Sequence, residues 1–162
     1  PLDLFDIKYR YQKAFERGNK EIDNNTLMKI TKLTKGYAYA FQDLGYYVWQ
    51  NSDNKVTEES VEKSIPLFKN DLFRNAYTKI LSELSPTDRK FLFIMANCPK
   101  NIVEISYIRE QMKKSSNYIS QYRQRLMDSQ VIVDAGYGKV TFSLPFMKDF
   151  LLEAAELYGI EE

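Results

Sequence analysis

The chain has 162 residues, a net charge of +1, 44% hydrophobic residues and 14% aromatic residues. This length suits one ordinary domain or two small ones, and the apolar content excludes a disordered tail. A single cysteine, Cys98, excludes an intramolecular disulfide framework. Nothing resembles a signal peptide, and no apolar run approaches the ~20 residues that span a bilayer. These features predict a cytoplasmic protein.

The inventory of reactive side chains argues against catalysis. The chain has no histidine, which is the commonest general base and metal ligand in proteins. Cys98 therefore has no histidine to activate it, and no G-x-x-x-x-G-K-[ST] phosphate-binding loop occurs. The carboxylates of Glu58, Glu59 and Glu62 read as the opening turns of a helix, where acidic groups favour the helix dipole, and not as a metal cluster. We therefore predict no catalytic residue, no metal site and no cofactor for this chain.

Helical spacing dominates the first half of the chain. A first helix ends at Gly18, and a second, capped by Asp23 or Asn24, has Leu27, Ile30 and Leu33 on one face. A third helix is expected over residues 37–49, followed by a polar loop over 51–55. Thr57 caps a fourth helix, which Pro66 is expected to break or kink. A further helix is expected over residues 67–84.

The second half follows a different pattern. Ser85 and Pro86 place a cap residue before a proline at the first helical position, which is a strong helix start and the expected domain boundary. β-Branched residues and a Gly-Tyr-Gly turn predict a hairpin. The expected elements are helices over 86–98, 105–112 and 116–128, strands over 131–134 and 139–144, and a last helix opened by Pro145 and ending near Tyr158.

The charge is distributed unevenly between these regions. Residues 1–84 carry a net charge of +1, residues 85–144 carry +4, and residues 145–162 carry −4. An acidic partner such as nucleic acid would thus be attracted to the middle region and repelled by the tail.

The run TKGYAYAFQDLGYYVW, residues 34–49, resembles the lid helix that follows the nucleotide-binding core in prokaryotic AAA-type/STAND-like P-loop ATPases. Gly36, Tyr37, Ala38 and Tyr39 occupy the lid motif, in which the family usually has proline at the position of Ala38. The family's phosphate-sensing lid arginine is not evident. The resemblance implies a C-terminal piece of an ATPase whose core, with its ATP and Mg²⁺, lies outside this chain. The aromatic side chains of this helix either pack in a core or form a stacking platform near the nucleotide.

The run SPTDRKFLFIMA and the run YISQYRQRLMDSQVIV resemble parts of the winged helix-turn-helix of the same family. Gln130 stands where that family usually has the glycine that ends the recognition helix, so we expect a different turn there. The implied fold class is mainly α: a helical lid bundle followed by a winged helix-turn-helix with a β-hairpin wing. The expected divisions are a lid at residues 1–50, a helical linker at 51–84 and a winged-helix domain at 85–158.

If Ile119, Tyr122 and Leu126 face inward, the amides and hydroxyls of the recognition helix face outward. Amides and hydroxyls can read base edges, and lysine or arginine can neutralise phosphates. The candidate DNA-binding residues are Lys113, Lys114, Ser116, Asn117, Ser120, Gln121, Arg123, Gln124 and Arg125, with Tyr137 and Lys139 on the wing.

Two functions stay open at this point. In one, the winged helix of a non-catalytic lid and winged-helix region binds duplex DNA. In the other, it is a protein–protein or autoinhibitory module that docks on a partner or on its own ATPase core. Loss of that core is expected to leave an apolar patch near Tyr11, Phe15, Tyr37 and Phe41 and to allow weak self-association. No membrane partner is expected.

Overall fold

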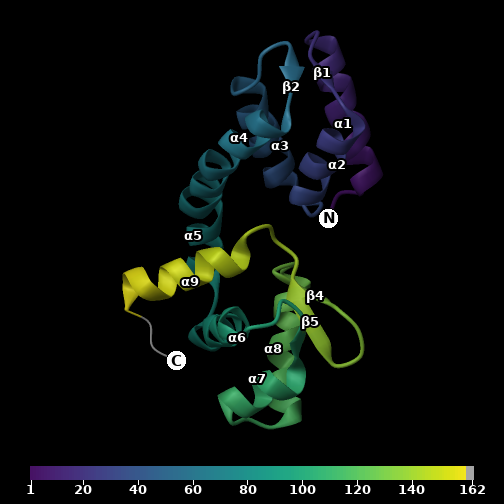
Figure 1. Ribbon diagram of the computed structural model, residues 1–162. Coiled ribbons are helices and arrows are strands. Elements are labelled where there is room, and N and C mark those ends of the chain that lie inside the picture. Colours follow the sequence, from purple (N-terminus) through teal and green to yellow (C-terminus); the bar gives the residue numbers. More distant parts are fainter. Residues whose placement is uncertain (160–162) are drawn as a thin grey trace. The chain divides into compact units, whose positions relative to one another are not determined.

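The computed structural model describes residues 1–159, and these are mainly helical with two small sheets (Figure 1). They divide into two compact units, the first covering Pro1–Thr78 and the second beginning at Lys79. Among these residues, none of the helices combines the length and apolar content that crossing a bilayer requires.

The first unit is a helical bundle with one short pair of strands. Its elements are α1 (Leu4–Arg17), β1 (Glu21–Ile22), α2 (Asn24–Leu33), α3 (Ala38–Gln50), β2 (Lys55–Val56), α4 (Glu58–Asp71) and the π-helix η1 (Leu72–Tyr77). The short helix α5 (Thr78–Glu83) follows and crosses the division between the units.

Local capping explains where these helices begin. Asp3 accepts hydrogen bonds from the backbone N–H groups of the first turn of α1, and Asp23 does the same for α2. Thr57 and Ser60 form a reciprocal capping box at the start of α4. Each of these side chains satisfies N–H groups that have no partner within the helix. The predicted cap at Asp23 or Asn24 is resolved in favour of Asp23.

Strands β1 and β2 pair in parallel, with Glu21 opposite Lys55 and Ile22 opposite Val56. Residues 51–55 were predicted to form a loop, and no strand was expected here. Two residues are too few to show an alternating pattern, which explains why the sequence did not predict this pairing.

The core of the first unit contains side chains from every major helix. Tyr11 and Phe15 are 3% and 2% exposed, so the predicted apolar patch around these two residues is wrong. Tyr11 donates a hydrogen bond to the carbonyl of Phe41 and packs on the Phe41 ring, which explains why the Tyr11 side chain turns inward. The exposed aromatic side chains of α1 are instead Phe5 (85%) and Tyr9 (60%).

The sequence predicted a break or a kink at Pro66, which lies inside α4. Because α4 continues to Asp71, the break is wrong, and the kink stays a prediction. Pro66 is exposed, and its ring therefore does not compete with core packing. The irregularity comes later, where α4 passes directly into the π-helix η1. A π-helix accommodates one extra residue per turn and has no simple signature in the sequence.

The second unit contains three helices, a small sheet and a final helix. The elements are α6 (Pro86–Asn97), β3 (Val103–Glu104), α7 (Ile105–Met112), α8 (Ser116–Asp128), β4 (Ile132–Asp134), β5 (Lys139–Phe142) and α9 (Met147–Tyr158). The predicted bounds of α7 and α8 agree with the structure, and the predicted hairpin is β4–β5.

The sheet of the second unit has the order β3–β5–β4, and both pairings are antiparallel. Figure 1 shows β4 and β5 side by side, joined by the turn that contains Gly136 and Gly138. The third strand, β3, was not predicted. It has only two residues, which lie directly before α7.

Two chain turns differ from the sequence expectations. Gln130 has a φ of +63°, so it adopts the left-handed conformation in which glycine usually ends such a helix. The expectation of a different turn was therefore wrong. Helix α9 begins at Met147, because Phe146 has a φ of +58° and separates Pro145 from the helix.

The boundary between the compact units falls close to the predicted boundary at Ser85. Most of the predicted linker, residues 51–84, lies in the first unit, where α4 packs against α3. The assignment of these segments to a lid, a linker and a winged-helix domain stays a prediction.

Among the glycines of the first unit, Gly18, which ends α1, has the least room for a side chain. A Cβ atom at this position would lie 1.7 Å from Cη2 of Trp49. We expect Gly18→Ala to destabilise the first unit by about 1–3 kcal/mol, because the ring must move to admit the methyl group. Unfolding in urea, followed by far-UV circular dichroism, measures this cost. The same change in a Trp49→Leu background removes the ring, and an equal penalty there would contradict the steric explanation.

Candidate nucleic-acid interface

Helix α8 exposes the polar face that the sequence predicted. Asn117, Ser120, Gln121 and Gln124 are all exposed, whereas Ile119 and Leu126 on the opposite side are fully buried. Tyr122, which was expected to face inward, is only half-buried and packs its ring on Tyr118, with ring centroids 5.1 Å apart. The outward face therefore presents amides and hydroxyls, which can donate to and accept from base edges.

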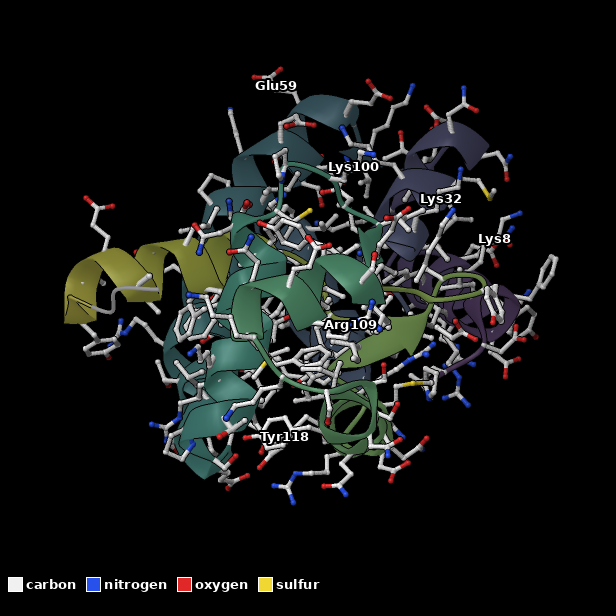
Figure 2. All side chains as sticks on the ribbon, turned by 90° about the horizontal axis from the view of Figure 1, so that it is seen from below. Lys8, Lys32, Glu59, Lys100, Arg109 and Tyr118 are labelled. Atoms are coloured by element: carbon white, nitrogen blue, oxygen red, sulfur yellow. The ribbon has the colours of Figure 1, made fainter. Side chains whose placement is uncertain are left out.

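The turn before α8 contributes positive charge. Lys113 and Lys114 are exposed, and Lys113 has a φ of +56°, which reverses the chain between α7 and α8. Ser115 caps α8 by accepting a hydrogen bond from the backbone of Tyr118. The guanidinium of Arg109 on α7 donates to the hydroxyl of Ser116 across 2.8 Å. Figure 2 labels Arg109 and Tyr118, whose side chains come from α7 and α8.

Arg125 is bound by a carboxylate of its own unit. Its Nε and Nη2 atoms donate to the two oxygens of Asp88 on α6, at 3.2 Å and 2.9 Å. Asp88 is 1% exposed and also forms the capping box with Ser85. Burial alone would raise the pKa of Asp88, but the hydrogen bonds from Arg125 and Ser85 outweigh it and hold the pKa below its ordinary value. Arg125 thus fastens α8 to the start of α6.

Arg123 is also paired within the unit. Its Nη2 lies 3.2 Å from Oδ1 of Asp134 on β4. Gln124, on the outward face, donates to Asp128 across 2.8 Å. The structure therefore brings carboxylates to both predicted phosphate-binding arginines and to the edge of the predicted base-reading face. This arrangement lowers the positive charge that the face presents.

The β4–β5 turn forms an exposed tip beside these residues. Tyr137 is fully exposed, and Lys139 is exposed at the start of β5. The carbonyl of Gly138 accepts a hydrogen bond from the backbone N–H of Ile105 at 2.8 Å, which joins the tip to the start of α7. Both wing residues that the sequence singled out are thus open to a ligand.

Two cation–ring contacts, one at the start of α8 and one within it, were not predicted from the sequence. The ammonium of Lys114 lies 5.1 Å from the centre of the Tyr118 ring, and the guanidinium of Arg125 lies 5.6 Å from that of Tyr122. The spacing of four residues from the turn into α8, and of three residues within α8, is the signal from which these contacts could have been found. The partners Asp88 and Asp134 are distant in the sequence and had no such signal.

The run that the sequence predicted as a lid motif lies at the start of α3. Gly36 has a φ of +79°, and a Cβ atom there would meet the carbonyl of Leu2 at 2.7 Å. Ala38 is the first helical residue, where a proline also fits because its missing N–H needs no partner. Tyr37 lies before it, with its ring 6.1 Å from that of Tyr39. The motif thus has a local structural basis, and its role beside a nucleotide stays a prediction.

The carboxyl groups of Asp43 and Asp71 lie close together in the first unit. Tyr39 donates to Asp71 across 2.8 Å, and Asp43 lies against Asp71 with its Oδ2 buried. Burial, with the hydrogen bond to Asp71 and its charge, raises the pKa of Asp43 to about 8. The interaction with Asp43 lowers the pKa of Asp71 despite burial. Asp43 therefore keeps its proton below that pH, while Asp71 is ionised over most of the same range.

Residues 1–159 contain no group of three or more histidine, cysteine, aspartate or glutamate side chains that could hold a metal ion.

One family of known sequences matches part of the chain. The family described as "Domain of unknown function (DUF8462)" matches residues 74–151, just under half of the chain. No curated protein matches the chain.

Among solved structures, the chain is similar to the RuvB Holliday junction branch migration motor of Thermotoga maritima. The identity is 15% and the TM-score 0.42, over 99% of this chain and 50% of that one. Two substituted variants of the same protein match over the same shares with TM-scores of 0.42 and identities of 15% and 14%. The chain thus spans about half the length of these structures.

The raised pKa of Asp43 predicts a pH-dependent stability of the first unit. Between the ordinary pKa of 3.8 and about 8, folded Asp43 holds a proton that the unfolded chain has released. Stability must therefore fall as the pH rises through this window, most clearly between pH 5 and 8, and level off above it. The chain has no histidine to obscure this range. We expect Asp43→Asn to remove the slope, measured by amide hydrogen exchange of α3 and α4. Asp53→Asn, in an exposed loop, is the control, and an unchanged slope in Asp43→Asn would show that Asp43 is not the group that titrates.

The contacts of Asp88 predict that its substitution strongly lowers the stability of the second unit. Asp88→Ala removes the capping box of α6 and both hydrogen bonds from Arg125, and we expect a loss of about 3 kcal/mol in the free energy of unfolding. Arg125→Ala keeps the capping box and leaves Asp88 bonded to Ser85, so its cost should be smaller by about 1 kcal/mol. Urea denaturation of the full chain measures both. Equal losses in the two variants would show that the capping box contributes nothing.

Proposed function

We propose that this chain is the lid and winged-helix region of a prokaryotic P-loop ATPase, and that its winged helix binds duplex DNA. The observation that carries the DNA-binding proposal is the exposed polar face of α8, flanked by lysines at its start and by the exposed tip of the β4–β5 turn. Three helices followed by this hairpin follow the element order of a winged helix, in which such a helix enters the major groove. The parentage rests on the lid motif and on the resemblance of α6, α8 and β4 to that family.

In this proposal the contacts divide by chemistry. Asn117, Ser120 and Gln121 read base edges, because their side chains both donate and accept. Lys113, Lys114 and Lys139 contact phosphates, since they are exposed cations around that face. Tyr137 extends from the wing toward the backbone or groove. The region has no catalytic role, and ATP and Mg²⁺ bind to the core of the parent protein.

A second function has a specific observation in its favour. Asp88, Asp134 and Asp128 bind polar or cationic side chains of α8, so the face carries little unopposed positive charge. Such a balanced polar surface also suits a protein partner, including the ATPase core of the parent in an autoinhibitory contact. Weak self-association of the region belongs to the same class.

Salt dependence separates the two functions. Each neutralised phosphate releases counterions, so affinity for duplex DNA should fall steeply with salt. We expect a dissociation constant of about micromolar or weaker at physiological salt, because few cations are available. Lys114→Ala should weaken binding to all sequences and reduce the magnitude of the slope of log K against log salt by about one unit. Gln121→Ala should act only on a preferred sequence. The measurement is a fluorescence anisotropy titration with mixed duplexes at several salt concentrations.

Lys90→Ala, an exposed lysine on α6, is the matched control and should leave the slope unchanged. If wild-type protein binds no duplex at low salt, or if Lys114→Ala and Lys90→Ala behave alike, the DNA-binding proposal fails and protein docking is favoured.

A further inference from the structure

Arg123 differs from the other cations of α8 in its environment. Its side chain is only 26% exposed, and its Nη2 lies 3.2 Å from Oδ1 of Asp134. Its Nε is buried and has no hydrogen-bond partner among the residues that the structure describes. By contrast, Lys113 and Lys114 are exposed at the start of the helix. Only a small part of the Arg123 side chain is therefore open to a phosphate.

Asp134 connects this arginine to the turn of the wing. The oxygen that faces Arg123 also accepts a hydrogen bond from the backbone N–H of Gly136 at 3.3 Å. The turn is closed further by a bond from Ala135 N–H to the carbonyl of Lys139 at 2.9 Å. One carboxylate oxygen therefore holds both the side chain from α8 and the backbone that leads to the wing tip.

The wing is also held on its opposite side, where β5 pairs with β3 and Lys139 lies opposite Glu104. The carbonyl of Gly138 accepts a hydrogen bond from Ile105 at the start of α7. This bond fixes the second half of the turn, and the pair of Arg123 and Asp134 fixes the first half. Between the two ties lies Tyr137, which is fully exposed and has no core contact to hold it.

We infer that Arg123 is a positioning residue that fixes the wing against α8 so that Lys139 and Tyr137 reach the DNA, and that it does not itself contact a phosphate. Because the pair with Asp134 is neutral, it adds no counterion release of its own. The part of this inference that concerns DNA rests on the proposed function. The part that concerns the wing does not.

The wing is tested without DNA by amide hydrogen exchange of the full chain. Arg123→Gln should accelerate exchange several-fold at Ala135, Gly136 and Lys139, because the tie from α8 is lost. Arg123→Lys keeps an ion pair with Asp134 and should restore most of the protection. Lys90→Gln is the control, since it removes an exposed cation of α6 and leaves the contacts of α8 with Asp88 and Asp134 in place. Unchanged exchange at the wing in Arg123→Gln would overturn the inference, whatever the protein binds.

The DNA part is tested by a cycle of salt titrations on a mixed duplex. The double variant Arg123→Gln with Asp134→Asn removes one charge of each sign, and Lys139→Ala removes the proposed phosphate contact. If Arg123 acts through the wing, each change alone should lower the slope by about one unit, and the two together by no more than one. If Arg123 contacts a phosphate directly, the combined loss is about two units and the inference is wrong. Wild-type protein that fails to bind any duplex would contradict the proposed function, while the exchange experiment would still decide the role of the wing.

Discussion

At the start of α6, the carboxylate of Asp88 accepts hydrogen bonds from the backbone and hydroxyl of Ser85 and from the guanidinium of Arg125. It is almost fully buried, so each of these bonds offsets part of the cost of removing a charge from water. The same group therefore begins one helix and holds another in place. The orientation of α8, and with it the polar face that the helix presents, depends on this contact.

The second unit shows why counting charges describes a binding surface poorly. Its middle region has a net charge of +4, yet Arg123 and Arg125 are both engaged by carboxylates that lie far away in the sequence. These two arginines organise the unit, and the exposed charge comes mainly from lysines in turns. A guanidinium suits the first role because its planar donors match a carboxylate, whereas an ammonium on a flexible stem suits the second.

Much of this arrangement could be predicted from the sequence, since its signals are local. The cap at Ser85, the spacing of Ile119 and Leu126, and the β-branched strands around a glycine turn all depend on neighbouring residues. The pairing of Asp88 with Arg125 joins residues that are far apart, and no local pattern encodes it. Gln130 misled the prediction for a different reason: local preference favours glycine in a left-handed turn, but the fold imposes that conformation on a side chain. The two-residue strands were too short to be recognised.

Trp49, the only tryptophan of the chain, packs in the first unit, where its ring stacks on Phe15 and lies under the ammonium of Lys20. An indole in this setting has an emission spectrum that depends on the surrounding polarity and on the nearby cation. Because the second unit contains no tryptophan, its melting cannot contribute to this signal directly. Selective excitation of the indole at long wavelength thus isolates one half of the protein optically. Differences from a whole-chain probe would reveal whether the two halves melt together or in succession.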